Sequence, residues 1–404
     1  MGDPLMRVLG RRAVPNPYPE YERIRARGEV SRHPLGLYLT ADHAVSRAAL
    51  CDPRFGVGPA TQRGGIDWQV VSGDEGRLVH PLEESLLVLN PPEHTRLRRM
   101  ASPLFAPYAV RELAPAIEGV VARILDEAER CERFDLVGDF ARRVPIQVMC
   151  ELFGIPHADH TTFVRWGTVL ADTLDGIRTF GERRAVRGVL AEMTDFLGAL
   201  LEKRRREPGD DLLSRLAAAE RDGESLDDRT LLALTGTLLI AGFETTVNVI
   251  ASAAVELMRS PDLRAMLLDD FGDVGEVVEE TLRIEPPVQV LLRIAREPVT
   301  LGGVDLPADA MLAIAVGGAN RDPAVFPEPH RFDLRRPNKR DHLAFSAGGH
   351  YCLGAGLARL EAELALRHLF SRMPRLEPAG EPRLRRTRNI RGHVSVPVRA
   401  GDRR

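Results

Sequence analysis

The chain has 404 residues, a length that allows a large buried core and one to three domains. Apolar residues make up 44% and charged residues 28%, as in ordinary soluble globular proteins, and a net charge of -3 gives no indication of binding to nucleic acid or an anionic membrane. Residues 1–20 carry charges and prolines without an apolar core, so neither a signal peptide nor a membrane anchor is expected. The 4 cysteines show no paired spacing, so neither a disulfide framework nor a zinc site is expected.

Helical periodicity dominates the chain, whereas the runs that predict strands are short. Helices are expected at residues 18–27, 41–50, 92–100, 110–129, 185–206, 227–259, 274–284 and 355–370. Strands are expected at residues 37–40, 295–301, 311–315 and 394–399. Residues 55–89 and 319–347 have no sustained period, and irregular stretches of this length commonly carry function. Because repeats and linkers are absent, residues 1–404 are expected to form one mainly α domain with a small antiparallel sheet.

The helix expected at residues 227–259 contains the segment Ala241-Gly242-Phe243-Glu244-Thr245-Thr246. A glycine inside a helix costs about 1 kcal/mol relative to alanine, and close approach of a ligand to the backbone would explain Gly242. The Thr245 hydroxyl can bond the carbonyl of Ala241, four residues back, and loosen the helix there. Glu244 and Thr245 also place a carboxylate beside a hydroxyl, a pair that can relay protons. Taken alone, the segment would be better explained as a buried helix with an incidental Glu-Thr pair.

A glycine-rich loop precedes the helix expected at residues 355–370, with the sequence Phe345-Ser346-Ala347-Gly348-Gly349-His350-Tyr351-Cys352-Leu353-Gly354. Unpaired N–H groups and the positive end of the helix dipole favour a thiolate at Cys352. The glycines let backbone N–H groups approach the sulfur, and Phe345 can shield it from water. An isolated Cys-Leu-Gly would be read as a buried structural cysteine, but the whole loop indicates a thiolate ligand for a metal.

The loop resembles the haem-binding signature of the cytochrome P-450 superfamily, and the resemblance extends from Asn16-Pro17-Tyr18-Pro19 to residues 391–399. It implies a single helix-rich P-450-type domain with small antiparallel β-sheets. It also implies one haem b per chain, with Cys352 as the axial ligand of the iron. A thiolate in that position favours cleavage of the O–O bond.

The resemblance assigns roles to the other motifs. Glu244 and Thr245 become the acid–alcohol pair, and Ala241, Gly242, Phe345 and Gly354 become haem contacts. Four basic residues match positions that bind the haem propionates: His94, Arg98, Arg293 and His350. Glu280 and Arg283 match the ExxR pair, which alone would be a surface pair worth about 0–1 kcal/mol. Arg331 fits the third member of this structural triad.

The implied function is that of a cytoplasmic, monomeric monooxygenase that acts on a small apolar organic substrate with O2. Electrons would come from a separate ferredoxin and ferredoxin reductase, which would dock on the cysteine side near Arg96, Arg99 and Arg359. The substrate pocket would be lined by parts of residues 55–89, by Leu239, Ile240 and Phe243, and by residues 288–292 and 392–394. Analogy alone suggests antibiotic or other natural-product biosynthesis. Two alternatives are a haem-thiolate sensor without turnover and a haem-thiolate enzyme that uses peroxide or catalyses a non-hydroxylating oxidation.

Overall fold

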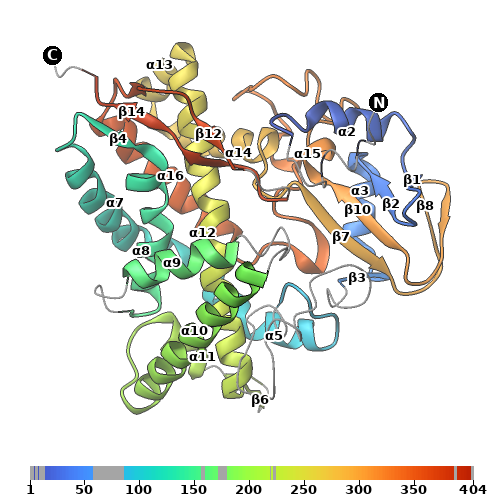
Figure 1. The fold of residues 1–404 in the computed structure, drawn as a ribbon, viewed down its shortest axis with the longest axis horizontal. Coiled ribbons are helices and arrows are strands. Elements are labelled where there is room, and N and C mark those ends of the chain that lie inside the picture. Colours follow the sequence, from blue (N-terminus) through green and yellow to red (C-terminus); the bar gives the residue numbers. More distant parts are fainter. Residues whose placement is uncertain are drawn as a thin grey trace.

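Two regions with different secondary structure lie side by side in the fold (Figure 1). The computed structural model describes residues 4, 8, 14–57, 86–155, 160–171, 180–218, 220–221, 224–385 and 389–401. The larger region is helical and holds the main hydrophobic core, which includes Ile124, Phe140 and Ile250. The smaller region surrounds a mixed sheet and has separate apolar clusters around Leu312 and Tyr21.

The helices mostly follow the expected segments. Their bounds are α2 Tyr18–Arg25, α3 His43–Cys51, α5 Glu93–Ala101, α6 Pro107–Glu112, α7 Ala114–Ala128, α8 Arg143–Leu152, α9 His160–Ala171, α10 Phe180–Arg206, α11 Leu212–Ala217, α12 Asp228–Arg259, α13 Pro261–Asp269, α14 Val274–Ile284, α15 Val316–Ala319 and α16 Ala355–Arg372. One expectation was wrong, because residues 110–129 belong to two helices. A proline in the first turn of α7 favours a helix start there and separates α7 from α6. Helices α8, α9, α11, α13 and α15 were not predicted.

Helix α12 crosses the centre of the molecule (Figure 1). Its N-cap is Asp227, whose side chain accepts a hydrogen bond from the Thr230 N–H at 2.7 Å. Helices α8, α9, α14 and α16 pack against it. Within the described part of the chain, α12 alone is long and apolar enough to cross a membrane, but 72% of its most apolar window is buried inside the protein. Its composition is therefore that of a core helix.

The principal sheet has five strands in the order β1 (Ser31–Arg32), β2 (Tyr38–Thr40), β10 (Met311–Ala315), β7 (Val290–Ala295) and β3 (Phe55–Gly56). Its pairs are antiparallel except β2 with β10, so the expectation of a purely antiparallel sheet was wrong at this pair. The small strands are β4 Arg133–Asp135, β5 Glu220–Arg221, β6 Glu224–Ser225, β8 Val299–Leu301, β9 Val304–Leu306, β11 Glu377–Pro378, β12 Arg383–Leu384, β13 His393–Ser395 and β14 Pro397–Arg399.

Two expected strands are each divided. The run at residues 295–301 covers the end of β7 and all of β8, and Pro298 lies between them, where a missing N–H prevents a continuous ladder. The run at residues 394–399 contains the end of β13, which pairs with β12, and all of β14, which pairs with β4 and β11. The two strands in each run therefore pair with different partners, and a period-2 pattern in the sequence does not reveal those partners.

The expectation of an irregular but ordered path at residues 319–347 is confirmed. After α15 ends at Ala319, this path contains one 3-10 turn at Lys339–Asp341 and leads directly into the cysteine loop. Most of the other irregular stretch, residues 58–85, lies outside the described residues.

Candidate active site

The cysteine loop joins the irregular path to α16. The Cys352 N–H donates to the Phe345 carbonyl at 2.9 Å, so the chain closes on itself across the loop. Gly348 has a φ of 65°, and a Cβ there would collide with the carbonyl of Leu50 at the end of α3. Glycine is thus required at Gly348 for both its backbone angle and its contact with α3.

The Cys352 side chain lies in the loop that precedes α16. It is exposed by its accessible surface, yet burial is the strongest influence on its thiol and raises its pKa. The Gly354 N–H, Arg98 and Arg359 act in the opposite direction and lower this pKa. Burial therefore outweighs the three groups that favour the ionised form of the thiol. A metal cation at the sulfur would favour the thiolate, which fits an iron ligand.

Phe345 and Arg359 cover one side of this loop. The Arg359 guanidinium lies over the Phe345 ring, with its central carbon 4.5 Å from the ring centroid. Arg359 also donates to the buried carboxylate of Glu279 and, at 3.3 Å, to the Tyr351 hydroxyl. The pKa of Glu279 is lowered to about 2, because hydrogen bonds from His342 and Arg359 outweigh its burial. Arg359 is therefore anchored inside the fold by an ionised partner.

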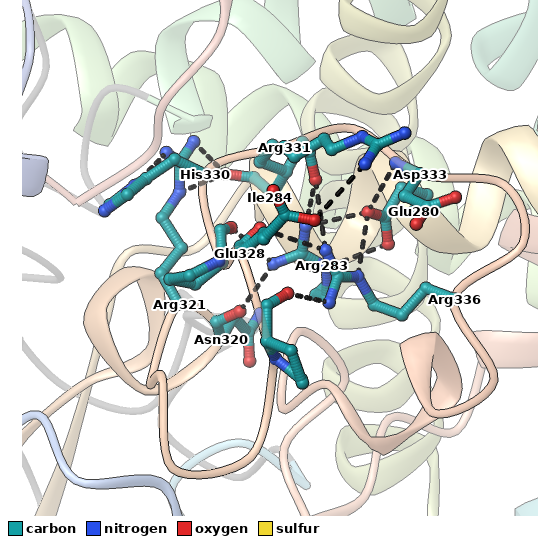
Figure 2. A network of polar contacts seen from close by, with 12 residues as sticks. Glu280, Arg283, Ile284, Asn320, Arg321, Glu328, His330, Arg331, Asp333 and Arg336 are labelled. Atoms are coloured by element: carbon teal, nitrogen blue, oxygen red, sulfur yellow. Dashed lines mark hydrogen bonds and ion pairs between the residues drawn. The ribbon is translucent and has the colours of Figure 1, made fainter.

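A buried ion network holds the irregular path against α14 (Figure 2). The two carboxylate oxygens of Glu280 accept from Arg283 at 2.7 and 2.8 Å, and both side chains are fully buried. Arg283 also donates to the carbonyls of Asn320 and Pro329 at 3.0 and 2.8 Å. A short piece of α14 thereby fixes two points of the path that leads to the cysteine loop.

The third member of this network is Arg336, and the prediction of Arg331 was wrong. Arg336 donates from Nε to Glu280 at 3.2 Å and is 4% exposed, whereas the Arg331 side chain pairs with Glu328 at the surface. Only the backbone carbonyl of Arg331 enters the network, where it accepts from Arg283 at 3.0 Å. Figure 2 shows Arg336 reaching Glu280 from the side opposite Arg331. Both arginines lie in the same irregular segment, so local sequence gives no means of choosing between them.

The structure brings together the four basic residues expected at the propionates. The rings of His94 on α5 and His350 in the loop are 4.1 Å apart between centroids. The pKa of His350 is lowered to about 4 by burial and by the charges of His94, Arg293 and Arg98. Burial and Arg98 also lower the pKa of His94. These groups lie close enough to repel one another when charged.

Arg293 is a buried arginine of this cluster. It is 4% exposed, and burial lowers its pKa to about 10. It donates to the Leu292 carbonyl at 2.9 Å and to the Ser346 hydroxyl at 3.3 Å, and no carboxylate among the described residues pairs with it. A buried cation without an anion is costly unless a ligand supplies the negative charge. The cluster therefore fits the propionates of a haem.

The Thr245 hydroxyl donates to the Ala241 carbonyl at 3.0 Å, as predicted from the sequence. Glu244 is 5% exposed, and its carboxylate accepts a hydrogen bond from Arg385, a partner that the sequence did not indicate. A side chain at Gly242 would meet Met149 at an ordinary 3.7 Å, so packing alone does not require glycine there. Haem contacts at Ala241 and Gly242 stay predictions.

The expected substrate pocket stays a prediction. Leu239, Ile240 and Phe243 are 1%, 5% and 3% exposed and belong to the main apolar core. The Phe243 ring packs directly against the backbone of Gly167 in α9. Leu292, by contrast, is 50% exposed on β7 next to Arg293. The part of the expected pocket at residues 58–85 lies outside the described residues.

The fold and this arrangement of a cysteine loop beside unneutralised cations define a haem-thiolate protein. Comparison with known proteins agrees. A family model described as Cytochrome P450 matches residues 72–390. Cytochrome P450 140 of Mycobacterium bovis is 37% identical over 99% of this chain and 93% of its own length. The 6-deoxyerythronolide B hydroxylase of Saccharopolyspora erythraea is 36% identical over 90% of both chains.

Among solved structures, P450BioI in complex with a fatty acid-ligated acyl carrier protein superimposes with a TM-score of 0.88 and 30% sequence identity, over 95% of this chain and 98% of that one. The chain belongs to the cytochrome P450 family. It is a monooxygenase that binds haem b through a cysteine thiolate.

Proposed function

We propose that this protein hydroxylates or epoxidises a small, largely apolar organic substrate in natural-product biosynthesis, as one domain over residues 1–404. One oxygen atom of O2 enters the substrate and the other leaves as water, and the electrons come from a separate ferredoxin and ferredoxin reductase. The observation that carries this proposal is the cluster of Arg293, Arg98, His94 and His350 beside the Cys352 loop, a buried group of basic side chains for which the described residues supply no carboxylate partner. The hydroxylase among the relatives supports the type of reaction.

In this proposal Cys352 is the ligand of the iron, and the four basic residues bind the propionates. Bound haem supplies the centre at which O2 is activated, and the thiolate donates electron density that favours O–O cleavage. Residues of the chain itself deliver the protons. The Thr245 hydroxyl donates a hydrogen bond to the Ala241 carbonyl, which fixes its position. The neighbouring Glu244 side chain, once protonated, can donate a proton to this hydroxyl. Ala241, Gly242, Phe345 and Gly354 would contact the haem.

A spectrum tests the thiolate assignment directly. The reduced, CO-treated protein should absorb at the position typical of thiolate-bound haem, and Cys352→Ser should abolish that band. A band at the position typical of histidine-bound haem in the unchanged protein would contradict the assignment. The same spectrum does not depend on turnover, so it also applies to a haem-thiolate sensor.

Replacement of Thr245 separates monooxygenase chemistry from the alternatives. Thr245→Ala should direct electrons from product to hydrogen peroxide, because the hydroxyl that passes the proton is gone. Coupling equal to that of the unchanged enzyme would refute the relay. A protein with the thiolate band but no oxygen consumption in the presence of electron donor would be a sensor. Efficient product formation from added peroxide without electron donor would favour the peroxide-dependent alternative.

The electron donor is proposed to bind near the N-terminal end of α5. There Pro91, Pro92, Thr95, Arg96 and Arg99 line an open hollow of about 620 Å³. Arg359 contributes its charge from a fixed position, because Glu279 holds it. Arg96→Glu should weaken ferredoxin binding more at low salt than at high salt, since interactions of exposed charges are screened.

For the substrate, the exposed apolar side chain of Leu292 supports an apolar ligand. Free and carrier-protein-bound compounds, screened by the spin-state shift of the haem, would identify its class. We further propose a cytoplasmic monomer.

A further inference from the structure

The ion pair between Glu244 and Arg385 links two distant parts of the chain. Arg385 follows β12, and both side chains are 6% exposed. The Arg385 N–H also donates to the Gly392 carbonyl at 2.9 Å, which ties the two sides of the β12–β13 hairpin together. The hairpin therefore presents the arginine to α12 from a fixed backbone position.

A stripe of polar residues runs along α12 from this ion pair. Glu244, Asn248, Ser252 and Glu256 follow one another at intervals of four residues, and apolar residues predominate between them. Because four residues advance an α-helix by slightly more than one turn, about 40° per step, they wind along one side. Glu244 and Asn248 are buried, whereas Ser252 and Glu256 are half-buried. The stripe thus leads from the acid towards the surface.

Asn248 is the critical position in this stripe. It is 1% exposed, and neither its amide oxygen nor its amide nitrogen has a hydrogen-bond partner among the described residues. A Cβ on Gly392 would collide with this amide, so the hairpin backbone packs directly on it. The next residue, His393, likewise has a buried Nδ1 without a partner in that part of the chain. Buried polar groups of this kind are normally satisfied by ordered water.

We propose that protons reach Glu244 along this stripe, through water held by Asn248 and His393, and that Arg385 is the positioning residue that holds the Glu244 carboxylate at its inner end. This inference rests on the proposed role of Glu244 and Thr245 in proton delivery. The path needs groups that can both donate and accept hydrogen bonds, and an amide, a hydroxyl and a neutral imidazole all do so.

The charges around the stripe agree with this arrangement. Burial, Arg391 and Arg259 lower the pKa of His393 to about 4 against the influence of Glu285, so its imidazole is neutral near pH 7. Burial raises the pKa of Glu256 at the outer end, where Arg259, Glu285 and Arg321 are also near. A carboxyl group with a raised pKa exchanges protons with solvent closer to neutral pH than an ordinary one.

The activity test needs no knowledge of the substrate. Without substrate, the haem-loaded enzyme consumes NADPH through a surrogate ferredoxin and reductase and reduces O2 either to hydrogen peroxide or, with more protons and electrons, to water. Asn248→Leu and Arg385→Met should at least double the peroxide formed per NADPH and raise the solvent isotope effect on NADPH consumption. Arg385→Lys should raise the peroxide yield less than Arg385→Met does, because lysine keeps the positive charge.

Thr235→Val is the matched control. Thr235 is also a buried α12 residue whose hydroxyl has no partner in the described structure, but it lies nine residues before Glu244, on the opposite side of the helix. It should leave the peroxide yield unchanged. Ser252→Ala, at a half-buried position, tests the path a second time if Asn248→Leu does not fold. Unchanged peroxide yield and isotope effect in the folded stripe variants would overturn the proposal.

Unfolding measurements test the Glu244–Arg385 ion pair without turnover. In a double-mutant cycle of Glu244→Gln and Arg385→Met, the two changes should be non-additive in the free energy of unfolding by urea. Additive effects would show that Arg385 does not hold the Glu244 carboxylate. The proposed function fails separately: if Thr245→Ala leaves coupling unchanged, the relay itself is refuted and this inference with it. If Thr245→Ala uncouples the enzyme while the stripe variants behave like the unchanged protein, only this inference fails.

Discussion

Replacement of Arg336 should destabilise the protein far more than replacement of Arg331, although both are arginines of the same irregular segment. Arg336→Met removes a charged hydrogen bond to Glu280 and leaves the carbonyls of Pro327 and Glu328, which accept from Arg336 at 2.6 and 3.1 Å, without this donor. Breaking a buried ion pair by removing one partner costs about 3–5 kcal/mol. Because Arg283 still pairs with Glu280, we expect a loss near the lower limit, about 3 kcal/mol.

Arg331→Met is the matched control for this change. Its side chain is 63% exposed and pairs with Glu328, which is 73% exposed, so the expected cost is about 0–1 kcal/mol. Its carbonyl, which is the part that enters the network, stays in place. Urea unfolding of the two haem-loaded variants, followed by circular dichroism, gives the comparison. Equal costs for the two variants, or a cost for Arg336→Met below about 1 kcal/mol, would refute the structural role of Arg336.

Three further predictions concern the cysteine loop and its surroundings. Arg293→Met should weaken haem retention in a transfer assay to apomyoglobin at least tenfold, whereas Arg296→Met, an exposed change just past the end of the same strand, should not; equal retention would remove Arg293 from the propionate site. Gly348→Ala should cost about 1–3 kcal/mol because alanine disfavours this backbone angle, while Gly349→Ala, with open space around the position, should cost little. His393 has a folded pKa of about 4, below its ordinary value, so the unfolded chain binds more protons between about pH 6.5 and 4 and stability falls with acidification there. His393→Gln should therefore reduce the loss of stability between pH 7 and pH 4.5. If the variant loses as much stability as the unchanged protein, the pKa of His393 is not lowered by burial.

Several features of the site could be predicted because they depend on neighbours in sequence. The thiolate loop and the helix after it, the hydrogen bond from Thr245 to Ala241, and the ion pair of Glu280 with Arg283 are set by spacings of four residues or fewer or by one continuous motif. Such relations follow from helix geometry and from the chemistry of the residues alone.

Other features depended on residues far apart in the chain. The burial of Phe243 against α9 could not be predicted, because an apolar side chain on a central helix faces either a cavity or the core, and the helix that packs beside it decides which. The helices α8 and α9, which cover α12, were not predicted, and α8 begins without a side-chain cap that would mark its start. The split of residues 394–399 between two sheets likewise depended on their partners.

The sequence by itself determined the family, the cofactor and the cysteine that we propose as its ligand, because these are properties of a contiguous motif whose chemistry requires particular residue types. Only the tertiary structure decided which arginine completes the buried network, what holds the Glu244 carboxylate, and where the polar face of α12 leads. Arg336 and Arg385 resemble many other arginines in this chain until the fold removes them from water. Burial then makes their charges costly unless they are paired, and that cost, which is absent in the unfolded chain, selects their partners.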